Sequence, residues 1–230
     1  MASTSDRVQV IEAEYDEEGV YFYQAYNDAI AAWAVDHQRL GGPLWSVDRM
    51  TWIKPSFAWV LYRSGYASKH NQTRVLKIKL PHAAVAELLS GCSCGHGGGG
   101  TSGRVQWDPA RDLLAAEDKV PEPRKMLRRR AIQIGVKGRL REVFVREMLS
   151  IEDVTALARQ VGEAHASKEC AEAMARLAPL LPEERPYQPQ CDEEVLTRLG
   201  LAPGEVASRV AQLGFGKAKV QKKLTIKMNS

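Results

Sequence analysis

Cationic and aromatic side chains are concentrated between positions 49 and 66. Arg49, Lys54 and Arg63 supply guanidinium and ammonium groups, which bind the oxygens of phosphates and carboxylates. Trp52 supplies a flat indole face on which a nucleobase or a nicotinamide ring stacks. Ser56, directly after a proline, marks a helix start whose backbone amides are free to bind an anion. The segment is therefore a candidate site for a planar anionic ligand, but aromatic core residues flanked by surface cations give the same pattern.

A strongly basic strip follows later in the chain, at residues 124–146. From Arg124 to Glu147 nine basic residues stand against two acidic ones, a surplus larger than the +4 of the whole chain. Such a strip binds the phosphates of RNA, DNA or a nucleotide, and its binding weakens as salt rises. The alternative is a strand edge that its charges protect from aggregation. The residues that would bind nucleic acid are Arg128, Arg129, Arg130, Lys137 and Arg139.

The sequence favours no metal site. Cys92, Cys94 and His96 are separated by single residues, which departs from the spacing of zinc knuckles and supplies only three ligands. The glycine run that follows His96 is not succeeded by Gly-Lys-Ser/Thr, so it is not a phosphate-binding loop. Four cysteines in 230 residues are too few for a disulfide scaffold. We therefore expect no metal, and cysteines that are thiols.

Composition indicates a globular chain. The 230 residues, 44% of them hydrophobic, suffice for one large domain or for one domain with an appendage. No run of about 18 apolar residues is present, and positions 1–6 lack the basic and apolar character of a signal peptide. We therefore expect a soluble cytoplasmic protein without a membrane partner, with the nucleus as an open alternative. These patterns do not indicate an oligomeric state.

Hydrophobic periodicity predicts an α+β fold with a mixed, mainly antiparallel sheet core and flanking helices. Asn27 is the predicted N-cap of a helix over 28–37, and a second helix begins at Ser56 and ends at Gly65. The predicted strands are 8–11, 20–26, 50–54, 73–80, 104–109 and 131–136. Further helices are expected at 83–89 and, with a polar start at 150–155, up to about 181, while 141–149 is either a strand or a short helix.

The remaining segments are predicted as turns, a loop and a linker. Residues 16–19 are expected to form the turn between the first two strands, and Asp108 with Pro109 a second turn. Residues 91–103 are rich in glycine and predict a mobile surface insertion. The proline-rich segment 182–190 has the composition of an extended linker. The predicted domains are an α+β domain at 8–187 and a helical appendage with a basic tail at 188–230, which includes helices at 192–199 and 203–213.

Residues 49–67, with the sequence RMTWIKPSFAWVLYRSGYA, are similar to the hallmark segment of a family that is number forty-two ninety-one among the domains of unknown function. The resemblance covers roughly residues 8–187, with the glycine-rich segment as an insertion and the part after Gln188 as an extension. The family name implies no activity. Other blocks that resemble the family lie at 20–26, 105–112, 130–135, 151–155 and 181–187.

The order of elements also resembles that of ADP-ribosyltransferases. In those enzymes an early-strand His or Arg holds the nicotinamide-side ribose, a middle aromatic or hydroxyl residue packs on nicotinamide, and a late-strand Glu stabilises the oxocarbenium-like transition state. The resemblance places Gln24 in the first position, the region of Thr51 and Trp52 in the second, and Gln133 in the third. It implies an ADP-ribosyltransferase-like fold, with NAD as substrate, in a cleft also lined by Tyr26, Arg49, Lys54 and Arg63.

The resemblance implies a protein that binds NAD or a related nucleotide and transfers ADP-ribose to a protein or nucleic-acid acceptor. Gln24 cannot carry charge and Gln133 has no carboxylate, and these departures affect catalysis more than binding. Glu142 or Glu152 is the alternative source of the carboxylate. The second hypothesis is a nonenzymatic RNA- or DNA-binding protein that uses the basic strip, and the third is a structural interaction domain.

Overall fold

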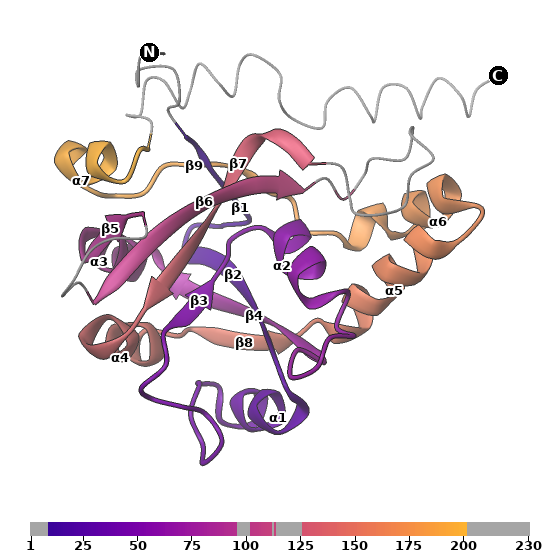
Figure 1. Ribbon diagram of the computed structural model, residues 1–230, viewed down its shortest axis with the longest axis horizontal. Helices are drawn as coiled ribbons and strands as arrows, with labels where there is room; N and C mark the ends of the chain where they lie inside the picture. The colour runs from indigo at the N-terminus through magenta and orange to yellow at the C-terminus, as the bar shows by residue number, and fades with distance from the viewer. Residues whose placement is uncertain (1–8, 96–101, 112, 114–125, 202–230) are drawn as a thin grey trace.

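The computed structural model describes residues 9–95, 102–111, 113 and 126–201, with backbone only at 126–129. Its strands form two main sheets, with the orders β2-β4-β8 and β3-β7-β6-β5, and a small sheet of β1 and β9 (Figure 1). The strands are β1 (Ile11–Ala13), β2 (Gly19–Tyr26), β3 (Thr51–Ile53), β4 (Arg74–Pro81), β5 (Cys92–Cys94), β6 (Gly103–Arg111), β7 (Met126–Val136), β8 (Ser150–Asp153) and β9 (Arg185–Tyr187). The helices are α1 (Asp28–His37), α2 (Phe57–Ser64), α3 (His82–Ser90), α4 (Gly138–Arg146), α5 (Thr155–Ala166), α6 (Cys170–Leu177) and α7 (Glu193–Arg198), with a 3₁₀ turn at Ala178–Leu180.

Each main sheet contributes a row of buried apolar side chains to one shared core. In the first sheet, Phe22, Ile78 and Ile151 lie opposite one another on β2, β4 and β8, and each is at most 3% exposed. In the second sheet, Ile53 of β3 lies opposite Ile134 of β7, and both are fully buried. All of these side chains belong to the same hydrophobic cluster. The α+β class with antiparallel and mixed sheets is therefore confirmed.

Tyr23 of β2 and Lys54, the residue after β3, join the two main sheets. The Tyr23 N–H donates to the Lys54 carbonyl at 2.7 Å, and the Lys54 N–H donates to the Tyr23 carbonyl at 3.2 Å. The two residues form an antiparallel bridge outside the named strands. The interior of β2 at Tyr23 and the chain directly after β3 are thus held side by side.

Local capping signals produce α1 and α2 where the sequence predicts them. The Asn27 side chain accepts from the Ile30 N–H at 2.9 Å, which confirms the predicted start of α1. At α2, Ser56 is the N-cap and Gly65, with a φ of +57°, is the left-handed C-cap. Residues 141–149 contain the second half of a helix, α4, rather than a strand. In Figure 1, α3 and α4 lie at one end of the sheets, and α5 and α6 lie at the other.

Four segments form strands whose pairing the local sequence patterns do not predict. The first strand, β1, pairs with β9 rather than with β2, although Tyr15 and Val20 bridge across the turn at 16–19. Its partner β9 lies within the predicted linker 182–190. Within the predicted glycine-rich loop, β5 pairs with β6 in parallel. The expected polar helix start at 150–155 begins with β8, which pairs with β4.

Two further segments differ from the prediction. Asp108 and Pro109 continue β6 instead of forming a turn. Proline has no N–H for a ladder, but β5 borders β6 only as far as Val105, so Pro109 lies on an edge. The long helix predicted up to about 181 is divided into α5 and α6. The Glu169 N–H there donates to Ser167 Oγ at 3.1 Å, a bond that competes with a continuous helix.

Residues 188–201, the described part of the predicted appendage, pack on the main core. Leu196, Leu199 and Leu201 belong to the same hydrophobic cluster as Ile78, and Gln9 forms a parallel bridge to Leu201. The predicted helix at 203–213 and the basic tail lie outside the described residues. No helix in the described ranges has the length and apolar character needed to cross a membrane.

The packing of α7 predicts that Leu196→Ala destabilises the whole protein. Leu196 is 4% exposed, and truncating a buried leucine costs about 2–5 kcal/mol. We expect this loss in the free energy of unfolding from urea titration, in one cooperative transition. Thr197→Ala, on the exposed side of the same helix, is the control and is expected to change stability by less than about 0.5 kcal/mol. An unchanged main transition in Leu196→Ala contradicts the shared core.

Candidate functional site

The junction between the two main sheets gathers polar side chains from separate strands. Lys54 is 5% exposed, and its Nζ donates to Gln24 Oε1 at 3.4 Å and to the Trp52 carbonyl at 3.1 Å. Because Ile53 pairs with Ile134 in an antiparallel ladder, the next position places Lys54 opposite Gln133. Three residues predicted for the site, Gln24, Lys54 and Gln133, therefore lie in one region.

Gln133 contacts two side chains of the neighbouring strand β6. Its Nε2 donates to Asp108 Oδ2 at 2.6 Å and to Gln106 Oε1 at 3.1 Å. Gln106 lies directly opposite Gln133 in the ladder, and Asp108 lies two positions further along β6 on the same face. We call Gln24, Lys54, Gln106, Asp108 and Gln133 the junction site.

The Lys54 amine has an unusual protonation equilibrium. Burial, with a smaller contribution from the Arg63 charge, lowers the pKa of Lys54 to about 7, and the charge of Asp108 opposes this shift. The amine therefore changes its charge near neutral pH. In its neutral form it can accept a proton, and in its charged form it can attract an anion.

The structure separates Trp52 from the other two predicted site residues, Tyr26 and Thr51. The Trp52 ring lies over Gly135 of β7, where an added Cβ would come to 3.0 Å from two ring atoms, so the glycine leaves room for the indole. Thr51 is 6% exposed, and together with Trp45 it adjoins the Tyr26 hydroxyl. Burial raises the pKa of that hydroxyl well above its usual range. Tyr26 and Thr51 thus gather around Trp45, and Trp52 touches the junction site through its carbonyl.

The predicted cations Arg49 and Arg63 are both exposed. Arg63 is near the end of α2, and its charge reaches Lys54. Arg49 lies in the connection between α1 and β3. The structure therefore places Arg63 at the border of the junction site and Arg49 on the outer surface before β3.

The expectation of free amide donors at the start of α2 is wrong for two amides. The Phe57 N–H donates to Glu184 Oε1 at 2.7 Å, and the Trp59 N–H donates to Ser56 Oγ at 3.4 Å. Glu184 comes from the segment just before β9. A carboxylate of the chain itself therefore occupies the place predicted for an anion.

The alternative carboxylates Glu142 and Glu152 lie on other surfaces. Glu142 is exposed on α4, 3.8 Å from Arg141. Glu152 is exposed on β8, opposite Lys77 of β4. The carboxylate that contacts Gln133 is that of Asp108, which sequence reasoning missed because Asp-Pro is typical of turns. The strand alternation Gln106, Asp108 was the available signal.

The basic residues of the strip whose side chains the structure describes, from Arg130 on, do not form one compact patch. Arg130, Lys137 and Arg139 are exposed, but Arg130 and Lys137 are separated by roughly 23 Å at the rise of an extended strand. Arg139 lies 3.5 Å from Glu87 of α3. The side chains of Arg128 and Arg129 lie outside the described residues. Beyond β7, the strip lines a shallow groove of about 560 Å³ whose charged residues are Arg39, Arg141, Glu142 and Arg146.

The cysteine-rich segment shows no catalytic or metal-binding geometry in its described part. Gly91, Ser93 and Gly95 have the Gly-x-Ser-x-Gly spacing of a hydrolase elbow, which is a sharp turn from a strand into a helix. Here the spacing spans β5, which follows α3. His96 lies outside the described residues, and among those described no cluster of His, Cys, Asp or Glu has the arrangement of a metal site.

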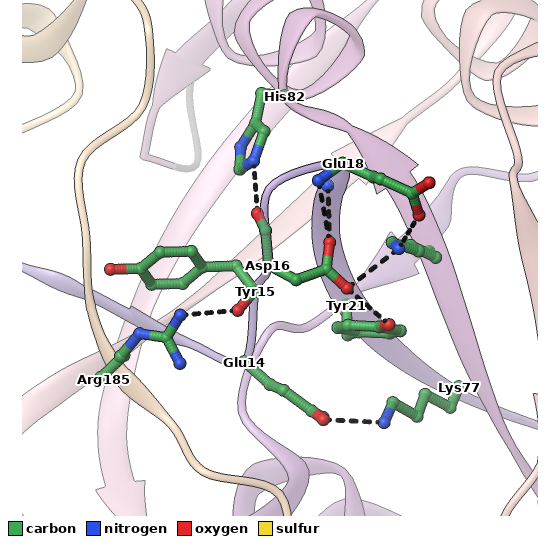
Figure 2. Close-up of polar contacts among 10 residues, drawn as sticks. Glu14, Tyr15, Asp16, Glu18, Tyr21, Lys77, His82 and Arg185 are labelled. Carbon is green, nitrogen blue, oxygen red and sulfur yellow. Dashed lines mark hydrogen bonds and ion pairs between the residues drawn. The ribbon is translucent and has the colours of Figure 1, made fainter.

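A second polar network, drawn in part in Figure 2, lies around Glu14 and Asp16 on the other face of the first sheet. Glu14 accepts from the Tyr23 hydroxyl at 2.7 Å and from Lys77 Nζ at 2.9 Å. Asp16 accepts from Lys79 at 2.9 Å and from the Tyr21 hydroxyl at 3.0 Å. The Lys79 ammonium thereby holds the pKa of the Asp16 carboxyl well below its usual range. These bonds fasten the turn at 16–19 onto β2 and β4.

The pKa of Lys54 predicts how Lys54→Met changes stability with pH. Between pH values of about 7 and 10.5, Lys54 is protonated in the unfolded chain and neutral in the folded protein. The free energy of unfolding of the wild type therefore falls as the pH decreases through this window. The variant lacks this loss. Its stability relative to wild type is therefore expected to rise by up to ~1.4 kcal/mol per pH unit as the pH falls from 10 to 7.

Urea titrations of both proteins at several pH values measure this difference. Lys168→Met, at an exposed position, is the matched control and is expected to show no such dependence. A difference between Lys54→Met and wild type that is constant over this range would rule out the depressed pKa.

Comparison with protein-family models matches residues 10–187 to a family described as Domain of unknown function (DUF4291). The match spans the strands and helices that build the junction site, and it ends at the last residue of β9. No curated protein matches the chain.

Proposed function

Because the chain belongs to the DUF4291 family, whose name assigns no activity, we propose a function from the junction site itself: it binds NAD or a related nucleotide and transfers ADP-ribose to an acceptor. The observation that carries this proposal is the proximity of Gln24 of β2, Lys54 directly after β3 and Gln133 of β7. Gln24 and Gln133 are the residues that the resemblance to ADP-ribosyltransferases places in the first and third positions.

The junction side chains suit binding of the nicotinamide ribose. The amides of Gln24 and Gln133 have both donors and acceptors, so each can bond a ribose hydroxyl. Trp52 supplies an aromatic face for the nicotinamide ring. Arg63, and Arg49 as the sequence predicts, attract the pyrophosphate.

The transfer requires one bond to break and one to form at the ribose carbon C1′. The bond from C1′ to the nicotinamide nitrogen breaks, and its electron pair leaves with neutral nicotinamide. An oxygen of the acceptor then bonds to C1′ and releases its proton. The neutral Lys54 amine, with its pKa of about 7, is the proton acceptor in this proposal.

Incubation of the full chain with NAD tests the proposal. A ligand at 100 times its dissociation constant stabilises the folded protein by about 2.7 kcal/mol, so we expect a clear rise in melting temperature. Mass spectrometry is expected to detect free nicotinamide and an ADP-ribosylated product. The absence of both the thermal shift and nicotinamide release contradicts the proposed function.

Single substitutions locate the nucleotide. Gln24→Ala and Trp52→Ala are expected to weaken NAD binding about tenfold or more, because they remove a ribose contact and a stacking face. Arg49→Ala tests the phosphate contact predicted from the sequence. Arg176→Ala, at an exposed position on α6, is its matched control. Wild-type affinity in Gln24→Ala and Trp52→Ala excludes the junction as the nucleotide site.

The second candidate function is nonenzymatic binding of RNA or DNA. The exposure of Arg130, Lys137 and Arg139 favours it. The same preparation distinguishes it, because nucleic-acid affinity falls steeply with salt and does not depend on NAD. A salt-dependent complex with RNA or DNA, together with no response to NAD, supports this function instead.

A further inference from the structure

Asp108 is the carboxylate that lies within the junction site among the described residues. Its Oδ2 accepts the 2.6 Å hydrogen bond from Gln133 Nε2, and its charge acts on Lys54 across the site. The side chain is half-buried, so it is open to a ligand on one side. It stands on β6, on the face that also carries Gln106.

The proposed reaction needs a negative charge at this place. Breaking the bond between C1′ and nicotinamide leaves positive charge on C1′ and the ribose ring oxygen. The amides of Gln24 and Gln133 and the neutral Lys54 amine carry no charge, and the nearby Arg63 cation opposes such a charge. A fixed carboxylate stabilises it strongly, because the charge develops only in the transition state.

We propose that Asp108 is the catalytic carboxylate of the junction site, which stabilises the positive charge at C1′ while Gln133 holds it in place. This inference rests on the proposed function. Asp108 forms no bond to C1′ and takes no proton. The electron pair of the broken bond leaves with nicotinamide, the acceptor oxygen forms the new bond, and the acceptor proton passes to Lys54.

Gln133 orients the carboxylate without neutralising it. The amide nitrogen bonds Asp108 Oδ2, and in the described part of the chain no donor bonds the other oxygen, Oδ1. That oxygen is left to face the ribose. Together, Gln133 of β7 and Asp108 of β6 thus provide the orientation and the negative charge that one late-strand glutamate supplies in ADP-ribosyltransferases.

Other nearby acids are engaged elsewhere. Glu184 accepts from the Phe57 N–H at the start of α2, and Glu14 binds both the Tyr23 hydroxyl and Lys77. Both therefore stabilise the fold around the site.

Asp108→Asn tests the proposal because asparagine keeps the shape of the side chain and an oxygen for Gln133. We expect kcat for nicotinamide release to fall about 100- to 1,000-fold, with the dissociation constant for NAD within about threefold of wild type. Asp36→Asn, at an exposed position on α1, is the control and is expected to keep wild-type kcat. Asp108→Glu keeps the charge and is expected to release nicotinamide faster than Asp108→Asn. Thermal melting shows which variants are folded, and if Asp108→Asn does not fold, Asp108→Glu is compared with Asp108→Ser.

The outcomes separate this inference from the proposed function. Wild-type protein that neither binds NAD nor releases nicotinamide overturns both. Active wild-type protein with an equally active Asp108→Asn variant overturns the role of Asp108 alone. A variant that loses NAD binding in proportion to turnover also overturns it, because Asp108 then contributes to substrate binding and not to the transition state.

Discussion

The two backbone hydrogen bonds between Tyr23 and Lys54 are the constraint on which the candidate site depends. They join the main sheets at a point where the Lys54 amine is surrounded by protein. A buried ammonium is costly, and the nearest acceptors here are neutral, namely the Gln24 amide and the Trp52 carbonyl. The pKa of about 7 is therefore a consequence of where the sheets meet.

Tyr23 also connects the junction site to the network on the outer side of the first sheet. Its ring packs on Phe57 of α2 with 5.0 Å between ring centroids, and its hydroxyl donates to Glu14. Burial, with the charge of Glu14, raises the pKa of Tyr23 well above its usual range, so the hydroxyl stays a donor. Elements on both sides of β2 thus hold the backbone that positions Lys54.

The parts of the structure that local chemistry decides could be predicted from the sequence, and the parts that distant pairing decides could not. Asn27, Ser56 and Gly65 cap α1 and α2 through contacts within a few residues. Of the residues that meet at the junction, the sequence offers Gln24, Lys54 and Gln133 as candidates. At Asp108 the sequence predicts a turn, because Asp-Pro is typical of turns. Its actual place beside Gln133 depends on the register of β6 with β7, which no local pattern encodes.

The pairing of β1 with β9 has a consequence for how the chain folds during synthesis. Tyr15 and Pro186, which are hydrogen-bonded to each other, are 171 positions apart, and Glu184 satisfies the first amide of α2 from the same late segment. A nascent chain cannot make these contacts until almost the whole family domain has left the ribosome. Until then β1 has no strand partner, and closing so long a loop slows folding. The last step of folding is therefore expected to be the arrival of the segment around Glu184, which completes both the small sheet and the start of α2.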